Sequence, residues 1–259
     1  MKDTIFYKAD FLCTSMDYHP VYATAGEENL YETLRAKGYR PLIIHTLHYT
    51  YLDEAKKAVA DIRERKEDFP EDAAHGLLVE IDKPHSEITN FLKGQQQHFD
   101  LLLGQGGLNK SNRFFIEQAP VDVRIDPQSQ KRLMKRDFIH HFNMGLNHVL
   151  LKEAARRNII IVVTLNTLLS TKQETVKGFG RLQQLFSLMR RYQVAGTITS
   201  CARHPCQIKS KQAYRHFLEL YSLEPGKIAE MEPSLSDRVR ENAFKRSSSY
   251  ISEGIEVIE

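Results

Sequence analysis

Five side chains of the kinds that bind divalent cations lie at or after the carboxyl ends of predicted strands of this 259-residue chain: His45, His48, Glu80, Asp126 and His204. Imidazole and carboxylate groups are the usual ligands of zinc, manganese and iron. Brought together, they would hold a metal ion that activates water for phosphoester hydrolysis. The alternative is that these groups hydrogen-bond to one another within the structure, as buried polar groups must. We favour this second interpretation.

Two other segments suggest a ligand site but lack part of its pattern. Residues 201–206 (CARHPC) offer three zinc ligands without a fourth, and no second Cys/His pair occurs elsewhere, so a closed zinc site is not expected. Residues 104–107 (GQGG) match neither GxGxxG nor a Walker motif with its lysine, which favours a tight loop. Three cysteines without a CxxC motif indicate a reducing compartment and no disulfide scaffold.

Basic side chains gather after the fifth and the seventh predicted strands. The first group is Lys131, Arg132, Lys135 and Arg136, followed by His140 and His141; the second is Arg203, Lys209, Lys211 and Arg215, with His204. Arg113 follows the fourth strand. If these segments share one rim of the molecule, their cations form a surface that binds RNA phosphates. The alternative is a solvated polar surface, which most charged segments are.

Strands and helices alternate along the chain and must position these residues. Strands are predicted at residues 4–13, 41–47, 76–81, 99–103, 121–125, 159–165 and 194–200, and helices at 25–37, 53–68, 87–93, 112–117, 147–157, 173–192 and 211–221. Residues 159–165 are apolar on both faces, which is typical of parallel sheets covered by helices. Parallel neighbours need helical crossovers, so the pattern favours a (β/α) barrel over a doubly wound sheet, although seven strands suit both. In such a barrel the functional face lies at the carboxyl ends of the strands.

The length allows one or two domains, and a single α/β barrel would use it fully. We expect a single barrel over residues 1–230, and a peripheral or partly disordered tail over residues 231–259, which lose the apolar periodicity. Lys and Arg number 36 against 33 Asp and Glu, and this net charge of +3 neither favours nor excludes an anionic partner. No run of about 18 apolar residues and no signal peptide are found, so we expect a soluble, cytoplasmic protein with no membrane contact.

Short motifs in the middle of the chain occur in a recognisable order. They are residues 100–103 with Gly106 and Gly107, the pair Asn112-Arg113, residues 121–123, residues 145–150 and residues 166–169. In this order they resemble the p30-type protein subunit of ribonuclease P, called protein component 3 in archaea. The resemblance is best from residue 99 to 200 and weak before residue 77. It implies a TIM-like barrel related to the polymerase-and-histidinol-phosphatase phosphoesterases, and it decides between the barrel and the doubly wound sheet.

The chain departs from those phosphoesterases at two places where they carry metal ligands. They have a His-x-His pair after the first strand, where this chain has Thr14-Ser15, and a histidine after the fifth strand, where it has Asp126. These differences argue against a metal site. Arg113 matches the family's Asn-Arg pair and would contact RNA or hold the adjacent loop, since a guanidinium forms planar, bidentate hydrogen bonds. The pair Asn147-His148 also matches the family, and a helix cap explains it equally well.

The resemblance implies a subunit that helps a catalytic RNA remove the 5′ leader of precursor tRNA. The RNA supplies the chemistry through its bound magnesium, so no catalytic residue, no metal ligand and no cofactor are expected in the protein. The implied partners are ribonuclease P RNA, precursor tRNA and the other protein subunits, especially the small ferredoxin-like protein component 2. A free-standing metal-dependent phosphoesterase on the same barrel is the main alternative. A scaffold protein without RNA contacts is another.

Overall fold

The structure of this chain is a computed structural model. It describes residues 17–22, 28–82, 86–106, 109–128, 143–165, 172–219, 235–248, 250–252 and 255–256.

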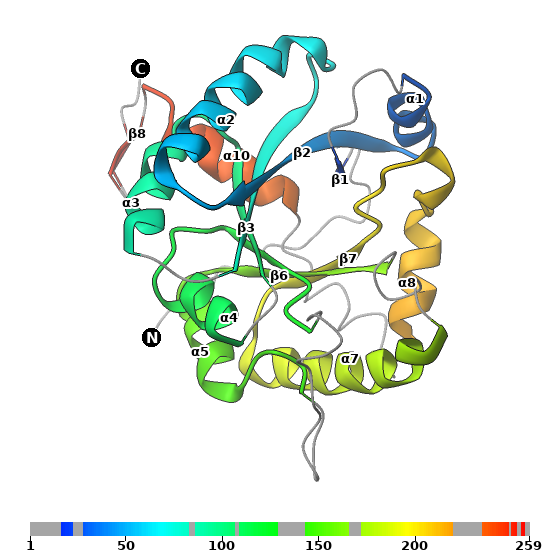
Figure 1. Ribbon diagram of the computed structural model, residues 1–259. Helices are drawn as coiled ribbons and strands as arrows, with labels where there is room; N and C mark the ends of the chain where they lie inside the picture. The colour runs from blue at the N-terminus through cyan, green and yellow to red at the C-terminus, as the bar shows by residue number, and fades with distance from the viewer. Residues whose placement is uncertain are drawn as a thin grey trace.

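The described strands form a parallel, nearly closed barrel (Figure 1). Its strands, each paired with the next, are β1 Asp17–Tyr22, β2 Tyr39–Tyr49, β3 Ala74–Ile81, β4 Leu101–Gly106, β5 Val123–Ile125, β6 Ile160–Thr164 and β7 Gly196–Thr199. The Tyr22 amide donates a hydrogen bond to the Ala202 carbonyl at 2.9 Å, which brings the chain beyond β7 next to β1. The predicted TIM-like barrel is therefore confirmed.

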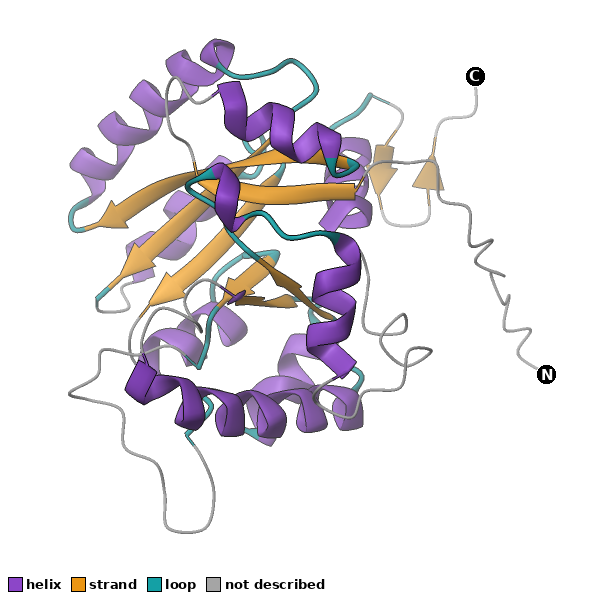
Figure 2. Cartoon of the chain, turned by 90° about the vertical axis from the view of Figure 1, so that its right-hand side faces the viewer, coloured by secondary structure: helices purple, strands orange, loops and turns teal. Residues whose placement is uncertain are grey.

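Helices surround the strands on the outside, as Figure 2 shows. They are α1 Glu28–Ala36, α2 Leu52–Glu64, α3 Ser86–Gln95, α4 Asn109–Glu117, α5 His148–Arg156, α7 Lys172–Tyr192, α8 Lys211–Glu219 and α10 Leu235–Lys245, with short 3-10 helices η1 Arg65–Asp68 and η2 Pro205–Gln207. A separate antiparallel pair joins β8 Tyr250–Ser252 to β9 Ile255–Glu256. Among the described residues, no helix is long and apolar enough to cross a membrane.

The core has two layers because successive side chains of a strand point to opposite faces. In β2, Leu42 and Ile44 face the barrel interior, whereas Ile43 packs in the outer layer beneath the helices. The interior is filled with apolar side chains and is therefore no pore. Polar chemistry is left to the strand ends and to the outer surface.

The first described strand lies outside the segment predicted for it. Residues 4–13, and Thr14-Ser15 after them, lie outside the described residues. β1 is instead Asp17–Tyr22, and its carboxyl end is Tyr22. The strand is hard to predict because Asp17, His19 and Pro20 interrupt its apolar pattern. Pro20 is tolerated because β1 is the first strand in the sheet order, and proline is confined to such edges.

Helix α10 belongs to the barrel, although we expected a peripheral tail from residue 231. Its Leu235 and Val239 are buried in the interior layer with first residues of several strands, among them Ala74, Leu101 and Val123. The helix therefore covers the amino-terminal end of the barrel. Only two apolar side chains, one turn apart in a highly charged helix, carry this contact, which explains why the apolar periodicity does not predict it.

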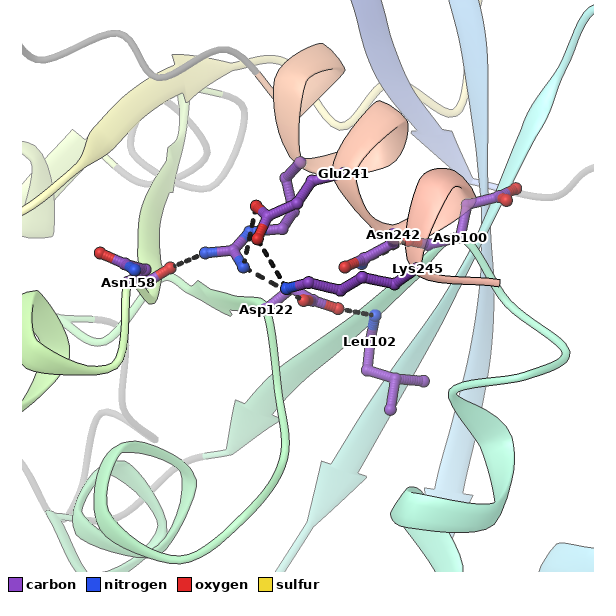
Figure 3. Close-up of polar contacts among 8 residues, drawn as sticks. Asp100, Leu102, Asp122, Asn158, Glu241, Asn242 and Lys245 are labelled. Atoms are coloured by element: carbon purple, nitrogen blue, oxygen red, sulfur yellow. Dashed lines mark hydrogen bonds and ion pairs between the residues drawn. The ribbon is translucent and has the colours of Figure 1, made fainter. Parts of the chain in front are cut away.

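Polar contacts hold α10 in this place (Figure 3). The Asn242 side-chain amide donates to the Asp100 carbonyl at 2.8 Å. The Arg238 guanidinium donates to the Asn158 carbonyl and lies 4.0 Å from a carboxylate oxygen of Asp122. That aspartate also accepts the Leu102 amide at 2.9 Å. These bonds satisfy backbone groups at the amino-terminal ends of β4 and β6.

Candidate nucleic-acid interface

A buried arginine lies between β5 and α4, in the outer layer of the core, because its strand neighbours Val123 and Ile125 face the barrel interior. Arg124 of β5 is fully buried, and burial lowers the pKa of its guanidinium to about 9, while nearby Asp126 raises it. Its Nε donates to Asn112 Oδ1 at 2.8 Å, and its Nη1 donates to the Gly104 carbonyl at 2.7 Å. The guanidinium carbon lies 5.4 Å from the Phe115 ring centroid. Arg124 therefore has structural partners for its charge, as a buried cation requires.

Asn112 extends this network to two loops. Its side-chain amide donates to the Pro127 carbonyl at 3.0 Å and to the Gly145 carbonyl at 2.8 Å. Gly145 has a φ of +85°, and a Cβ atom there would lie 1.8 Å from the Pro127 oxygen. The asparagine of the Asn112-Arg113 pair is thus a structural residue, and the glycine is required by backbone conformation and space.

Asp126 also has a structural role. Its carboxylate is buried and accepts the Thr164 amide at 2.7 Å and the Gln128 side chain at 3.0 Å. The Thr164 hydroxyl donates to its second oxygen. The backbone of Asp126 is left-handed, with a φ of 44°, which aspartate tolerates better than most residues. These bonds join the end of β5 to the end of β6.

The other candidate metal ligands do not join Asp126. His45 lies in the outer layer, with its Nε2 atom 3.0 Å from His75 Nδ1 and its ring against Phe69. His48 is exposed and lies 3.9 Å from Glu80, while His204 precedes η2. Within the part of the chain that the structure describes, no group of three His, Cys, Asp or Glu side chains could hold a metal ion. The five-residue metal site is therefore not assembled.

Two histidines are buried as neutral groups. His19 Nε2 lies 2.8 Å from Ser200 Oγ, and burial, with a smaller effect of Lys37, lowers the pKa of His19 to about 3. Burial followed by the neighbouring His75 lowers the pKa of His45 to about 3 as well. Neither imidazole is charged at neutral pH, so neither contributes to an anion-binding surface.

The predicted common rim of cations is only partly formed. Arg203 lies at the carboxyl end of β1, where its guanidinium carbon is 4.5 Å from the Tyr22 ring centroid. Lys211 lies at the opposite end of the strand, because its ammonium is 5.5 Å from the ring of Tyr39, which pairs with Asp17. The loop after β7 therefore runs the full height of β1, and the expectation that its cations share one rim is wrong for Lys211.

Besides Arg113, Lys209 is the one remaining predicted lysine or arginine whose side chain the structure describes. Lys209 is partly buried, and its ammonium donates to the Cys206 carbonyl at 3.2 Å. Lys131, Arg132, Lys135 and Arg136, with His140 and His141, lie outside the described residues, as does the side chain of Arg215.

Arg113 lies on the outer surface, in a groove that crosses the first turn of α5 from α4 to α7. We call it the α4–α7 groove; it has a volume of about 820 Å³, and its lining includes Arg113, Glu117, Val149, Leu188, Arg191 and Tyr192. Arg113 Nε donates to Glu117 at 2.7 Å while most of the side chain stays exposed. Asn143, at which the described chain resumes, also lines the groove.

Sequence reasoning missed Arg191, Tyr192 and the nearby Lys152. The Arg191 guanidinium carbon and the Lys152 ammonium lie 5.8 and 5.6 Å from the Tyr192 ring centroid. The signal was the run of residues 190–192 (RRY), two cations followed by an aromatic at a helix end. That run precedes β7, whereas we expected the site in the segments that follow the carboxyl ends of the strands.

The fold and the site together define a TIM-like barrel protein with structural polar groups at its mouth and exposed cations on its surface. Residues 24–248 match the family described as RNase P subunit p30, and the chain belongs to this family.

Proteins of similar sequence and structure support the assignment to this family. Ribonuclease P protein component 3 of Methanococcoides burtonii is 28% identical over 177 residues, covering 67% of this chain and 68% of the relative. The protein of the same description from Methanococcus maripaludis strain C6 is 23% identical over 236 residues, covering 90% of this chain and 94% of the relative. A chain in the cryo-EM structure of archaeal Ribonuclease P with mature tRNA has a similar fold, with a TM-score of 0.69, 18% identity and coverage of 94% of this chain and 98% of that chain.

Proposed function

We propose that this chain binds the RNA of ribonuclease P and supports it in removing the 5′ leader of precursor tRNA. The observation that carries the proposal is the family match over residues 24–248, which includes the barrel strands from β2 to β7 and α10. In this proposal the RNA performs catalysis with its own magnesium. No residue of the chain is catalytic, and none binds a metal or cofactor.

The mouth of the barrel supports a binding role. In many barrel enzymes the carboxyl ends of the strands present free acids and bases to the substrate. Here the carboxylate of Asp126, at the end of β5, is buried and bonded to Thr164 and Gln128. Exposed cations such as Arg113 and Arg203 are instead available to phosphates, which bind by charge neutralisation and counterion release.

The proposal keeps the predicted RNA contacts and partners. The contacts are Arg113, Lys131, Arg132, Lys135, Arg136, Arg203, Lys209, Lys211 and Arg215. The partners are the RNA, precursor tRNA and the other protein subunits, with the small ferredoxin-like protein component 2 as the expected close partner in the cytoplasm. Because Arg203 and Lys211 lie at opposite ends of β1, these contacts belong to more than one face.

Affinity purification of the tagged chain from native cells tests the proposal. We expect ribonuclease P RNA to co-purify, and the purified complex to cleave the 5′ leader of precursor tRNA. A complex reconstituted without the chain should cleave less at limiting magnesium. Absence of that RNA from the purified material, together with metal-dependent phosphodiesterase activity of the chain alone, would instead favour the phosphoesterase alternative.

A further inference from the structure

The α4–α7 groove has the chemistry of a site for single-stranded RNA. We propose that a single-stranded segment of RNA binds in this groove, with its phosphates at Arg113 and Arg191 and its bases against Tyr192 and Val149. This inference rests on the proposed function, since it says where on the chain the RNA lies.

The charges of the groove favour an anionic ligand. Arg113 on α4 is 71% exposed, and the hydrogen bond from its Nε to Glu117 leaves the outer face of the guanidinium accessible. Arg191 contributes a second exposed guanidinium from α7. Glu117 is the one carboxylate among the described residues that line the groove, and Arg113 neutralises it. The net charge of the lining is therefore positive.

The apolar groups of the groove favour single strands over duplex RNA. Val149 is 53% exposed, one of three large apolar side chains exposed among the described residues. Tyr192 lines the same groove and is partly exposed, with Lys152 and Arg191 close to its ring. Unpaired bases stack on aromatic and apolar side chains while their phosphates bind cations. In a duplex the faces of the bases are stacked on one another and cannot contact these side chains. An acidic peptide lacks a flat apolar group beside each of its charges.

The size of the groove suits more than one phosphate. Its volume of about 820 Å³ lies in the range of about 300–1,000 Å³ that sites for organic ligands occupy. Because Arg113 and Arg191 come from different helices, they approach such a ligand from two walls of the groove. The groove can therefore hold a short stretch of chain.

Photocrosslinking at Val149 tests the position of the RNA. Val149→p-benzoylphenylalanine, in the complex purified with its RNA, should crosslink to RNA under ultraviolet light. Tyr51, which is 67% exposed at the start of α2, provides the control position for the same substitution. Crosslinks from position 149 to another protein subunit, or none in a complex that contains the RNA, would overturn the inference.

Charge removal tests the phosphate contacts. Arg113→Gln/Arg191→Gln should weaken RNA binding about tenfold or more, and should reduce the slope of log K against log salt by about 1 for each cation. Arg113→Lys/Arg191→Lys keeps the charge and should keep the slope. Lys56→Gln/Lys57→Gln removes two exposed charges from α2 and is the matched control. Circular dichroism checks that each variant is folded.

The outcomes separate this inference from the proposed function. If the wild-type chain binds ribonuclease P RNA and Arg113→Gln/Arg191→Gln binds it with the same affinity and slope, the groove is not the site, while the proposed function stands. If the wild-type chain binds no such RNA, both are wrong.

Discussion

Acid should destabilise this protein through two buried histidines, His19 and His45. Only 4% and 5% of their surfaces are exposed, and burial lowers the pKa of each to about 3. In the unfolded chain the pKa of histidine is about 6.5, so below that pH the unfolded state binds protons that the folded state excludes. The stability that these neutral imidazoles contribute is therefore complete above pH 6.5 and is lost as the pH falls toward 3.

The expected loss of stability follows from the difference between the pH and the pKa of histidine in the unfolded chain. A pH of 5.0 is about 1.5 units below the pKa of histidine in the unfolded chain. Each unit of this difference lowers the free energy of unfolding by about 1.4 kcal/mol for each buried histidine. His19 and His45 should thus each lower the free energy of unfolding by about 2 kcal/mol, or about 4 kcal/mol together. Because pH 5.0 lies well above the native pKa of about 3, the loss depends little on its exact value. This loss of about 4 kcal/mol is a large part of the free energy of unfolding of a typical protein, which is about 5–15 kcal/mol.

Urea unfolding at pH 7.5 and pH 5.0 measures this loss. In His45→Phe, the new ring lies against Phe69 and Phe99 and binds no proton, so the difference between the two pH values should shrink by about 2 kcal/mol. His204→Gln removes an exposed imidazole and should behave as the wild type. Paired carboxylates also affect acid stability, but they are common to all three proteins and cancel in the comparison.

An unchanged pH dependence in His45→Phe would refute this reasoning, because it would show that His45 is protonated in the folded state or that the region is already open at pH 5.0. A wild-type protein that loses under about 1 kcal/mol between pH 7.5 and pH 5.0 would refute it for both histidines.

Three substitutions test the polar networks through urea or thermal unfolding. Asn112→Leu should lower the free energy of unfolding by about 3–5 kcal/mol, because it leaves the buried guanidinium of Arg124 without its main acceptor. Gly145→Ala should cost at least about 1–3 kcal/mol from left-handed backbone strain, and more from the clash with a carbonyl oxygen. Arg238→Met should cost about 1–3 kcal/mol by removing hydrogen-bonded charge between α10 and the barrel. Arg240→Met on the exposed face of the same helix is its control and should change stability by under about 0.5 kcal/mol.

The sequence predicts the barrel well where periodicity and packing agree. Six of the strands were expected within a few residues of their observed positions, since the segments predicted for β2 to β7 are mainly apolar and are separated by helical patterns. β1 was not expected, because its polar residues and proline are tolerated only through tertiary contacts such as that of His19 with Ser200. Helix α10 was missed for a related reason: its contribution comes from long-range bonds to Asp100 and Asn158.

The candidate site was harder to predict than the fold. The sequence identified Asn112, Arg113 and Gly145 as a pattern but could not divide them into structural and surface residues. Asn112 is buried beside Arg124, and Arg113, one position along the helix, points outward. A helix turns by about 100° for each residue, so neighbours in one motif face different surroundings. Only the register of α4 against β5 decides which residue is which.

The order of the strands determines the positions of fewer cationic side chains than we expected. A residue that follows a strand in the sequence lies near the end of that strand only if the loop stays there. From Ala202 to Lys211 an extended chain can span about 30 Å, whereas the six residues of β1 rise only about 20 Å. The loop after β7 can therefore reach the amino-terminal end of the barrel, and Lys211 beside Tyr39 does so. Arg203, close to β7, remains at the mouth. An RNA that contacts Arg203 and the α4–α7 groove must follow the outer wall of the barrel, so removal of charge at Arg203 should weaken binding independently of the groove variants.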